Sequence, residues 1–409
     1  MSANLILNIA IGILIVSFLF DAVLNRLNLK HSAQPIDPAF NYLYDSEKRN
    51  SALEYQRANY TANFWSDLVS TSVTVVMLAA GGFGLVDKFV RNFSENEIIV
   101  GLGFIAIIGL LGSIVSLPFG IYSTFVIEAK YGFNKTTIKT FVTDKIKGTI
   151  IGAIIGAPLF SAIVWIYLQL DSYFWLGTWI LITAFSLFTF AFGTTLILPR
   201  FNKLSPLEDG DLKTAILDYC NSQGYEVGRL FVMDGSKRST KANAFFAGIG
   251  KAKTIVLYDT LIEKLTIEEV VAVLAHEVGH YKRKHTLAMF ASNIIQTLGI
   301  TALLGWMLNY PEVSFALGAE VTSFHIAAVT FFLLFSPISM VLGLADMALS
   351  RRNEFDADEY SSSTYPKGVM KSALGKISTD ALANLNPHPL YVKVHYTHPP
   401  VIERLKALD

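Results

Sequence analysis

Seven long apolar segments constrain this chain more than any other feature of its sequence. A helix needs about 20 mostly apolar residues to cross a bilayer. One such segment is compatible with a buried helix of a large soluble protein, but seven together predict a multi-pass membrane protein. Composition agrees, because 52% of the residues are hydrophobic and 16% are charged, against about 25% charged in soluble domains. The segments lie at about 4–24, 65–86, 98–125, 148–170, 173–198, 286–309 and 323–349.

The distribution of Lys and Arg predicts how these spans are oriented. If each apolar segment crosses the membrane once, all of the 33 Lys and Arg residues except Lys88 and Arg91 lie on one side. The positive-inside rule assigns that side to the cytoplasm. We therefore expect the amino terminus outside, and the carboxyl terminus and the large polar segments in the cytoplasm.

Charge and cysteine content exclude several classes of protein. The net charge is zero, so nothing indicates nucleic acid as a partner. Basic residues near the span ends could contact anionic lipid headgroups, although topology explains them more simply. A single Cys220 excludes a disulfide framework and a Cys-rich metal site. The first apolar segment lacks a basic leader and a small-residue cleavage site, so we interpret it as a retained helix.

Two polar segments, 199–285 and 350–409, remain outside the spans. Together they reach a common domain size, and we expect them to form one small α+β domain on the cytoplasmic side. The predicted division is therefore a five-helix membrane region at 1–198, a first catalytic part at 199–285, helices six and seven at 286–349, and a second catalytic part at 350–409. Strand composition is found at 230–233 and 254–258, with a third candidate at 243–246.

The sequence His-Glu-Val-Gly-His at 276–280 predicts a metal site. Thr266 and Glu269 form the capping-box signature of a helix start, so the motif lies on the later turns of that helix. His276 and His280 then share one helix face and can bind Zn²⁺, and Glu277 can take a proton from a metal-bound water. Gly279 weakens the helix by about 1 kcal/mol, which is plausible where another backbone passes close to the metal.

Catalytic zinc usually has three protein ligands and a water, so a third ligand is needed. His285 is one residue from the position that one family of zinc proteases uses, and it falls on the wrong helix face. Glu354 and Asp358 are better candidates because they are four residues apart on one helix face. One carboxylate can bind zinc while the other accepts a hydrogen bond from a ligating histidine. The alternative is a solvated acidic helix turn.

The tail holds a third polar patch, with His395, His398 and Arg404. A His or Arg here could donate to the oxyanion that forms during peptide-bond hydrolysis. The alternative is a surface turn followed by a short terminal helix, and the residues alone do not choose between the two.

Together, 276–280, Glu354 with Asp358, and 398–400 with Arg404 resemble the type I CAAX prenyl protease family, which consists of integral-membrane zinc metalloproteases with seven spans. Three further stretches match, at 131–136, at 198–207, and at 235–238 with 243–245. The resemblance covers the chain from the second basic loop to its end, and the order of the spans ahead of it agrees.

The resemblance implies a role for each matching residue. His276, His280 and Glu354 would bind one zinc ion, Glu277 would be the general base, and Asp358 would orient a ligating histidine. His398 and Arg404 would act in catalysis by contacting the scissile region or the oxyanion. An extended substrate would add as a further strand beside the edge strand formed by Asn243, Ala244 and Phe245.

The resemblance also implies a fold and a location. The fold would be mainly α: seven transmembrane helices around a water-filled chamber, capped on the cytoplasmic side by a small zincin-like α+β metalloprotease domain. Family members often have His-Ser where this chain has Lys241 and Ala242, which affects fine substrate preference. The chain lacks an extended terminal tail and an endoplasmic-reticulum retrieval signal, so we favour a bacterial inner membrane over the endoplasmic reticulum.

The predicted function is zinc-dependent hydrolysis of peptide bonds, by resemblance the removal of the C-terminal tripeptide from prenylated CAAX proteins. One alternative is a quality-control protease for membrane proteins with related zinc chemistry. A second alternative, from another class, is a non-catalytic lipid-handling or scaffolding protein with a structural zinc.

Overall fold

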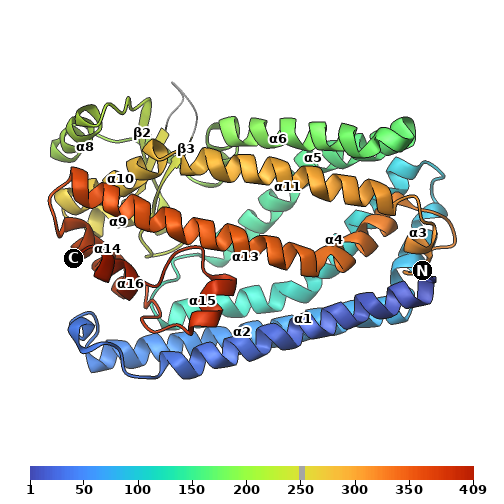
Figure 1. Ribbon diagram of the computed structural model, residues 1–409, viewed down its shortest axis with the longest axis horizontal. Helices are drawn as coiled ribbons and strands as arrows, with labels where there is room; N and C mark the ends of the chain where they lie inside the picture. Colours follow the sequence, from blue (N-terminus) through green and yellow to red (C-terminus); the bar gives the residue numbers. More distant parts are fainter. Residues whose placement is uncertain (248–253) are drawn as a thin grey trace.

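The computed structural model describes residues 1–247 and 254–409. Long helices run beside one another along the longest axis of the molecule, and Figure 1 shows the amino terminus at one end and the small sheet with the carboxyl terminus at the other. The long helices are α1 (Ala3–Ser32), α2 (Ser46–Ala79), α4 (Glu97–Tyr122), α5 (Ile138–Leu170), α6 (Phe174–Leu196), α11 (His285–Met307) and α13 (Phe324–Thr364).

The structure supports a multi-pass membrane protein. Among the described residues, five helical segments are long and apolar enough to cross a membrane, or six when the bent pair Ser46–Ala79 and Gly82–Arg91 is counted as one span. One of the five is the 56-residue segment Ile138–Gly193. It contains α5 and α6, which are joined by a 3₁₀ turn at Asp171–Tyr173. The count of seven spans stays a prediction.

The predicted span 65–86 is bent. Helix α2 ends at Ala79, and α3 (Gly82–Arg91) continues at an angle of 67°. Gly81 adopts a left-handed φ of 65° at the break, which glycine tolerates without steric cost. At Gly84 an added Cβ would lie 1.9 Å from the carbonyl oxygen of Gly318. The bend therefore packs glycine against glycine, and hydropathy alone did not predict it.

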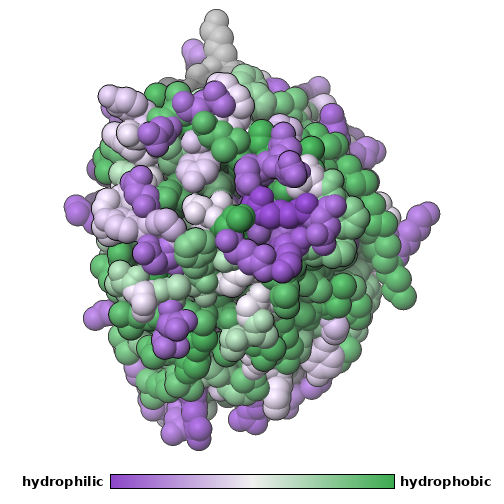
Figure 2. All heavy atoms as spheres, turned by 90° about the vertical axis from the view of Figure 1, so that its right-hand side faces the viewer, coloured by the Kyte–Doolittle hydropathy of each residue, from purple (hydrophilic) through white to green (hydrophobic). Residues whose placement is uncertain are grey.

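Charged groups tie the helices together at this end of the molecule. Arg91 donates to Glu97 at 2.7 and 3.0 Å and to Asp87 at 2.9 Å, and Asp87 lies 2.7 Å from Nε2 of His325 in α13. Figure 2 faces this end and shows hydrophobic residues around much of its edge and a group of hydrophilic residues near its centre.

A four-stranded sheet lies at the opposite end, in the order β1-β2-β4-β3. Strands β2 and β4 are parallel, and β1 and β3 pair antiparallel at the two edges. The three strands expected from composition are confirmed, whereas the short β1 was not predicted. It ends in Pro206, a residue that fits only an edge strand. The strands are β1 (Leu204–Pro206), β2 (Arg229–Met233), β3 (Ala244–Ala247) and β4 (Thr254–Tyr258).

Helices from both polar segments pack around this sheet. One hydrophobic core joins residues of β4 and of the helices at 211–222 and 267–282 to Ala373 near the carboxyl terminus. A second core joins Phe40 and Phe133 to Leu405 of the tail. The helices of the two polar segments are α8 (Asp211–Ser222), α9 (Asp259–Lys264), α10 (Ile267–Lys282), α14 (Val369–Asp380), α15 (Pro389–His395) and α16 (Val401–Ala407). Shorter segments are α7 (Leu198–Phe201), α12 (Glu312–Phe315), 3₁₀ turns at Pro38–Phe40 and Gly235–Lys237, and a π-helical stretch at Ser123–Glu128.

Candidate metal centre

Helix α10 carries the histidine motif, and its start is held firmly. The predicted capping box is present: the Glu269 N–H donates to the Thr266 hydroxyl at 3.3 Å, and the Thr266 N–H donates to the Glu269 carboxylate at 3.0 Å. The same carboxylate accepts hydrogen bonds from Ser372 at 2.7 Å and Lys376 at 2.8 Å, both on α14. The cap therefore fixes α10 against the second polar segment as well as starting the helix.

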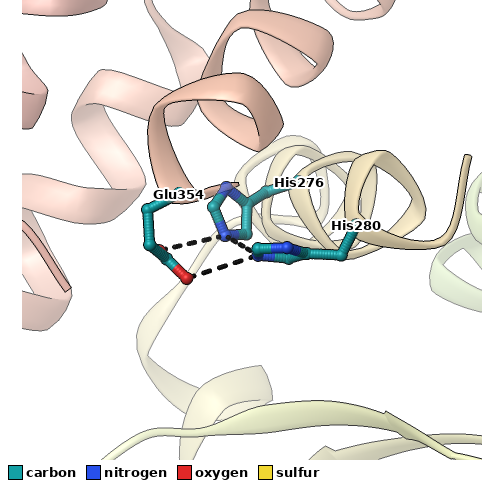
Figure 3. Close-up of side chains that lie close together, drawn as sticks. All are labelled: His276, His280 and Glu354. Carbon is teal, nitrogen blue, oxygen red and sulfur yellow. Dashed lines mark hydrogen bonds and ion pairs between the residues drawn. The ribbon is translucent and has the colours of Figure 1, made fainter. Parts of the chain in front are cut away.

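His276 and His280 of α10 face Glu354 of α13, as Figure 3 shows. The two Nε2 atoms are 3.2 Å apart, and the Glu354 carboxylate oxygens lie 3.5 Å from Nε2 of His276 and 3.3 Å from Nε2 of His280. The structure thus brings together the pair and the distant carboxylate that were predicted as zinc ligands.

The residues present fit a zinc ion. Zinc bonds of about 2.0 to 2.1 Å in a tetrahedron place neighbouring ligand atoms about 3.3 to 3.4 Å apart, close to the three separations observed. Oε2 of Glu354 is buried and has no hydrogen-bond partner among the described residues, although Nη1 of Arg404 lies 3.1 Å away. A cation would satisfy this oxygen and the facing imidazole lone pairs.

The outer nitrogen of His276 is held by a second carboxylate. Nδ1 of His276 lies 2.8 Å from Asp358, and Asp358 accepts hydrogen bonds of 2.7 Å from Nε and Nη2 of Arg404. This arrangement keeps a proton on Nδ1 and leaves the Nε2 lone pair facing the site. Burial lowers the pKa of His276, but the hydrogen bonds to Asp358 and Glu354 outweigh it and raise the pKa to about 9. The carboxylates thus create a strong preference for positive charge here.

Glu277 is half-buried and lies on α10 next to His276. Burial raises the pKa of its carboxyl group, and the nearby His276 and His280 oppose that effect. A raised pKa suits a general base, because it increases the affinity of the carboxylate for the proton that it must take.

A close helix contact sets the distance between the two halves of the site. At Gly279 an added Cβ would lie 3.2 Å from Cα of Ala357 and 3.0 Å from Cβ of Tyr360, both on α13. The backbone expected to pass close to the motif is therefore that of α13. Both distances are shorter than an ordinary van der Waals contact, so a larger residue at 279 would push α10 and α13 apart.

We expect Gly279→Val to separate these helices and to weaken zinc binding. Overpacking of this kind costs about 1 to 3 kcal/mol, so the melting temperature should also fall. Gly343→Val is a matched control, because Gly343 lies on α13 with nothing within 4 Å of an added Cβ. Zinc affinity and thermal unfolding of the two purified variants check the prediction, which fails if Gly279→Val binds zinc as tightly as Gly343→Val.

The other predicted site residues lie at different distances from the metal ligands. His398 is on the rim, with its side chain 62% exposed and Nε2 3.3 Å from Glu354. Asn243 precedes edge strand β3, which begins with Ala244 and Phe245, and β3 contacts α10. His395 lies elsewhere, with Nε2 3.5 Å from Asp21 of α1.

The sequence predicts that His285 falls on the wrong face of the motif's helix to bind the metal. In the structure α10 ends at Lys282, and His285 is the first residue of α11. Its Nδ1 lies 3.0 Å from Nδ1 of His280, a contact that was not predicted. A signal was present in the sequence: a histidine five residues after His280 reaches back to it if the helix breaks between them.

Lys241 anchors the chain just ahead of β3 to the membrane helices. Its Nζ donates at 2.9 Å to the hydroxyl of Tyr55 and at 2.9 Å to Glu128, and it lies 4.5 Å from the centre of the Phe133 ring. The departure from the family's His-Ser pattern therefore has a structural use here, because it ties the edge strand to α2 and to the π-helical stretch.

Comparison with known proteins agrees with this geometry. Residues 25–203 match the family described as CAAX prenyl protease N-terminal, five membrane helices, and residues 206–409 match peptidase family M48. A CAAX prenyl protease 1 homolog of Arabidopsis thaliana is 34% identical over 98% of this chain and 96% of its own. CAAX prenyl protease 1 of Saccharomyces cerevisiae is 30% identical over 97% of this chain and 94% of its own.

A solved structure extends the likeness to the whole fold. The crystal structure of S. mikatae Ste24p superposes with a TM-score of 0.94 at 28% identity, covering 99% of both chains. Sequence and structure thus agree across the membrane helices and the metal centre alike. This chain belongs to the CAAX prenyl protease family of membrane metallopeptidases, as its motifs predicted.

Proposed function

We propose that this chain is a zinc metalloendopeptidase that releases the C-terminal tripeptide of prenylated CAAX proteins. The observation that carries the proposal is the convergence of His276, His280 and Glu354 with ligand atoms 3.2 to 3.5 Å apart, with Glu277 beside them. The names of the relatives, CAAX prenyl proteases, support the substrate class.

The residues of this chain account for the proton transfers of hydrolysis. When bound, zinc supplies a polarised substrate carbonyl and a water whose pKa is near 7. Glu277 would take a proton from the attacking water as the water oxygen bonds to the carbonyl carbon, and would deliver that proton to the amine as the carbon–nitrogen bond breaks. His398, whose side chain is exposed and lies 3.3 Å from Glu354, would donate to the oxyanion.

Arg404 and Asp358 support these groups. Arg404 is buried and contacts Asp358 and Glu354, and these contacts favour a role in orienting a zinc ligand and its hydrogen-bonding partner. The predicted contact of Arg404 with the scissile region stays a prediction.

We further propose that the long helices form seven spans around a water-filled chamber. This number follows when the bent pair Ser46–Ala79 and Gly82–Arg91 is counted as one span, and α5 and α6, which a 3₁₀ turn joins at Asp171–Tyr173, are counted as two. The basic segments predicted to be cytoplasmic include both catalytic parts, so the metal centre would face the cytoplasm and the amino terminus the other side. A bacterial inner membrane stays the predicted location, with membrane lipid around the helices.

Substrate would lie beside β3 as one more strand. The Ala244 N–H donates to Oδ1 of its neighbour Asn243 at 2.8 Å, whereas the Asn243 carbonyl accepts from Tyr258 of β4. In an antiparallel pair, the backbone N–H and C=O groups of successive residues point alternately toward the partner strand and away from it. Those of Asn243 face β4, so those of Ala244 face the open edge of the sheet. An extended peptide can pair with it there.

Ala244→Pro should therefore impair substrate binding. Proline is tolerated at the first residue of a strand but removes the N–H. We expect KM for a peptide substrate to rise about tenfold, the loss of roughly one hydrogen bond, with zinc content unchanged. Ala244→Ser keeps the N–H and serves as the control. An unchanged KM for Ala244→Pro would rule out strand addition at this position.

One assay tests the proposed function. The purified protein would be given a farnesylated CAAX peptide, the same peptide without the lipid, and an unmodified membrane polypeptide, each with and without a zinc chelator. We expect cleavage of the farnesylated peptide that the chelator abolishes and added zinc restores. Equal cleavage of an unmodified membrane polypeptide would favour the quality-control protease, and no cleavage by zinc-loaded protein would favour the non-catalytic alternative.

A further inference from the structure

His280 has a hydrogen-bonding partner, His285, which is neither one of the proposed zinc ligands nor one of the carboxylates described above. Nδ1 of His280 lies 3.0 Å from Nδ1 of His285, and the two rings meet edge to face, 5.2 Å between centres. His285 is 7% exposed. A buried contact of this kind fixes the orientation of both rings, since neither ring can exchange its partner for water.

The positions of the two nitrogens of His280 decide which one carries the proton. Nε2 faces the site, 3.3 Å from Glu354 and 3.2 Å from Nε2 of His276, so its lone pair must be free to bind a cation. The proton is then on Nδ1, and Nδ1 of His285 must accept it. His285 consequently carries its own proton on Nε2.

An acid of α13 favours that arrangement. Nε2 of His285 lies 3.8 Å from Oδ2 of Asp356, too far for a direct hydrogen bond but close enough for electrostatic attraction to the N–H. Asp356 sits between Glu354 and Asp358. Asp358 thus faces His276, Asp356 faces His285, and Glu354 lies close to both His276 and His280.

The conformation of the turn between α10 and α11 places His285 beside His280. Helix α10 ends at Lys282 and α11 begins at His285, with Lys284 between them in the left-handed region at φ 59° and ψ 27°. This conformation costs a non-glycine residue about 1 to 2 kcal/mol. Such strain persists where the surrounding structure requires it and often marks a functional site.

We propose that His285 is a positioning residue for the metal, which fixes the tautomer and ring orientation of the zinc ligand His280. It mirrors the role of Asp358 toward His276, but with a neutral acceptor in place of a carboxylate. This inference rests on the proposed zinc site and adds to it a residue that binds no metal itself.

Zinc affinity and the spectrum of cobalt-substituted protein test the inference without reference to activity. His285→Leu removes the acceptor at similar volume, and we expect zinc to bind about 10- to 100-fold more weakly, with a shifted cobalt absorption band. In His285→Asn the side-chain oxygen takes the place of Nδ1, so affinity should stay within a few-fold of the parent protein. Lys284→Gly, which relaxes the turn but keeps the imidazole, should also retain zinc.

A comparison of His285→Gln with His285→Asn separates loss of the hydrogen-bond acceptor from general misfolding. Gln at 285 carries its polar atoms near the position of Nε2, one bond too far, so His285→Gln should bind zinc more weakly than His285→Asn although both are polar and similar in size. Equal zinc affinity and equal cobalt spectra for these two variants would overturn the inference while the zinc site stands. A parent protein that binds no zinc would overturn both.

Discussion

Glu277→Gln is expected to bind zinc normally and to lose almost all peptide cleavage. Glutamine keeps the size of the side chain but cannot take a proton from water. General-base catalysis contributes about 10²- to 10⁴-fold in rate, which is about 3 to 5 kcal/mol in the activation barrier. Because His276, His280 and Glu354 form the group that could hold a metal among the described residues, the metal content should not change.

The control for this prediction is Glu268→Gln, an exposed acid in the first turn of the same helix. Single-turnover cleavage of a farnesylated peptide and zinc content are measured for both variants. Near-normal turnover by Glu277→Gln would remove Glu277 as the base. Loss of zinc together with activity would instead assign it a structural role at the metal.

The parts of the site that sequence predicted are those set by local geometry. His276 and His280 are four residues apart, as are Glu354 and Asp358, so each pair shares a helix face wherever the helix lies. Hydropathy likewise located most of the long membrane helices, because it depends only on residues near in sequence. The pairing of the two motifs was inferred from the need for a third zinc ligand, and the resemblance to a family then assigned that role to Glu354.

The parts that sequence missed depend on contacts between distant segments. The packing of Gly84 on Gly318 involves backbone atoms of another segment, which no local pattern reveals. Gly279 predicted a close backbone, but not that this backbone is α13 at Ala357. Helix α13 runs unbroken from Phe324 to Thr364, through the boundary predicted between the last span and the second catalytic part. The last span therefore carries Glu354 and Asp358 rigidly into the site.

This continuity makes Glu354→Ala the strongest test of the metal centre. The substitution removes the only ligand that α13 contributes to the group His276, His280 and Glu354 found among the described residues. Loss of a residue that merely orients a ligand costs about 10- to 100-fold in metal affinity, so loss of the ligand itself should cost more than about 100-fold. Cleavage should be lost in parallel.

Glu359→Ala is the control, because it also removes one carboxylate from α13 but not one of the proposed zinc ligands. Glu359 lies on the same helix with its side chain 75% exposed, 3.8 Å from Arg283, and an exposed pair of this kind contributes little to stability. Zinc stoichiometry of the two purified variants, measured after dialysis against a chelator, is the deciding quantity. Full zinc retention by Glu354→Ala would mean that the two histidines hold the metal without α13, and the carboxylate would then serve only to balance the charge of Arg404.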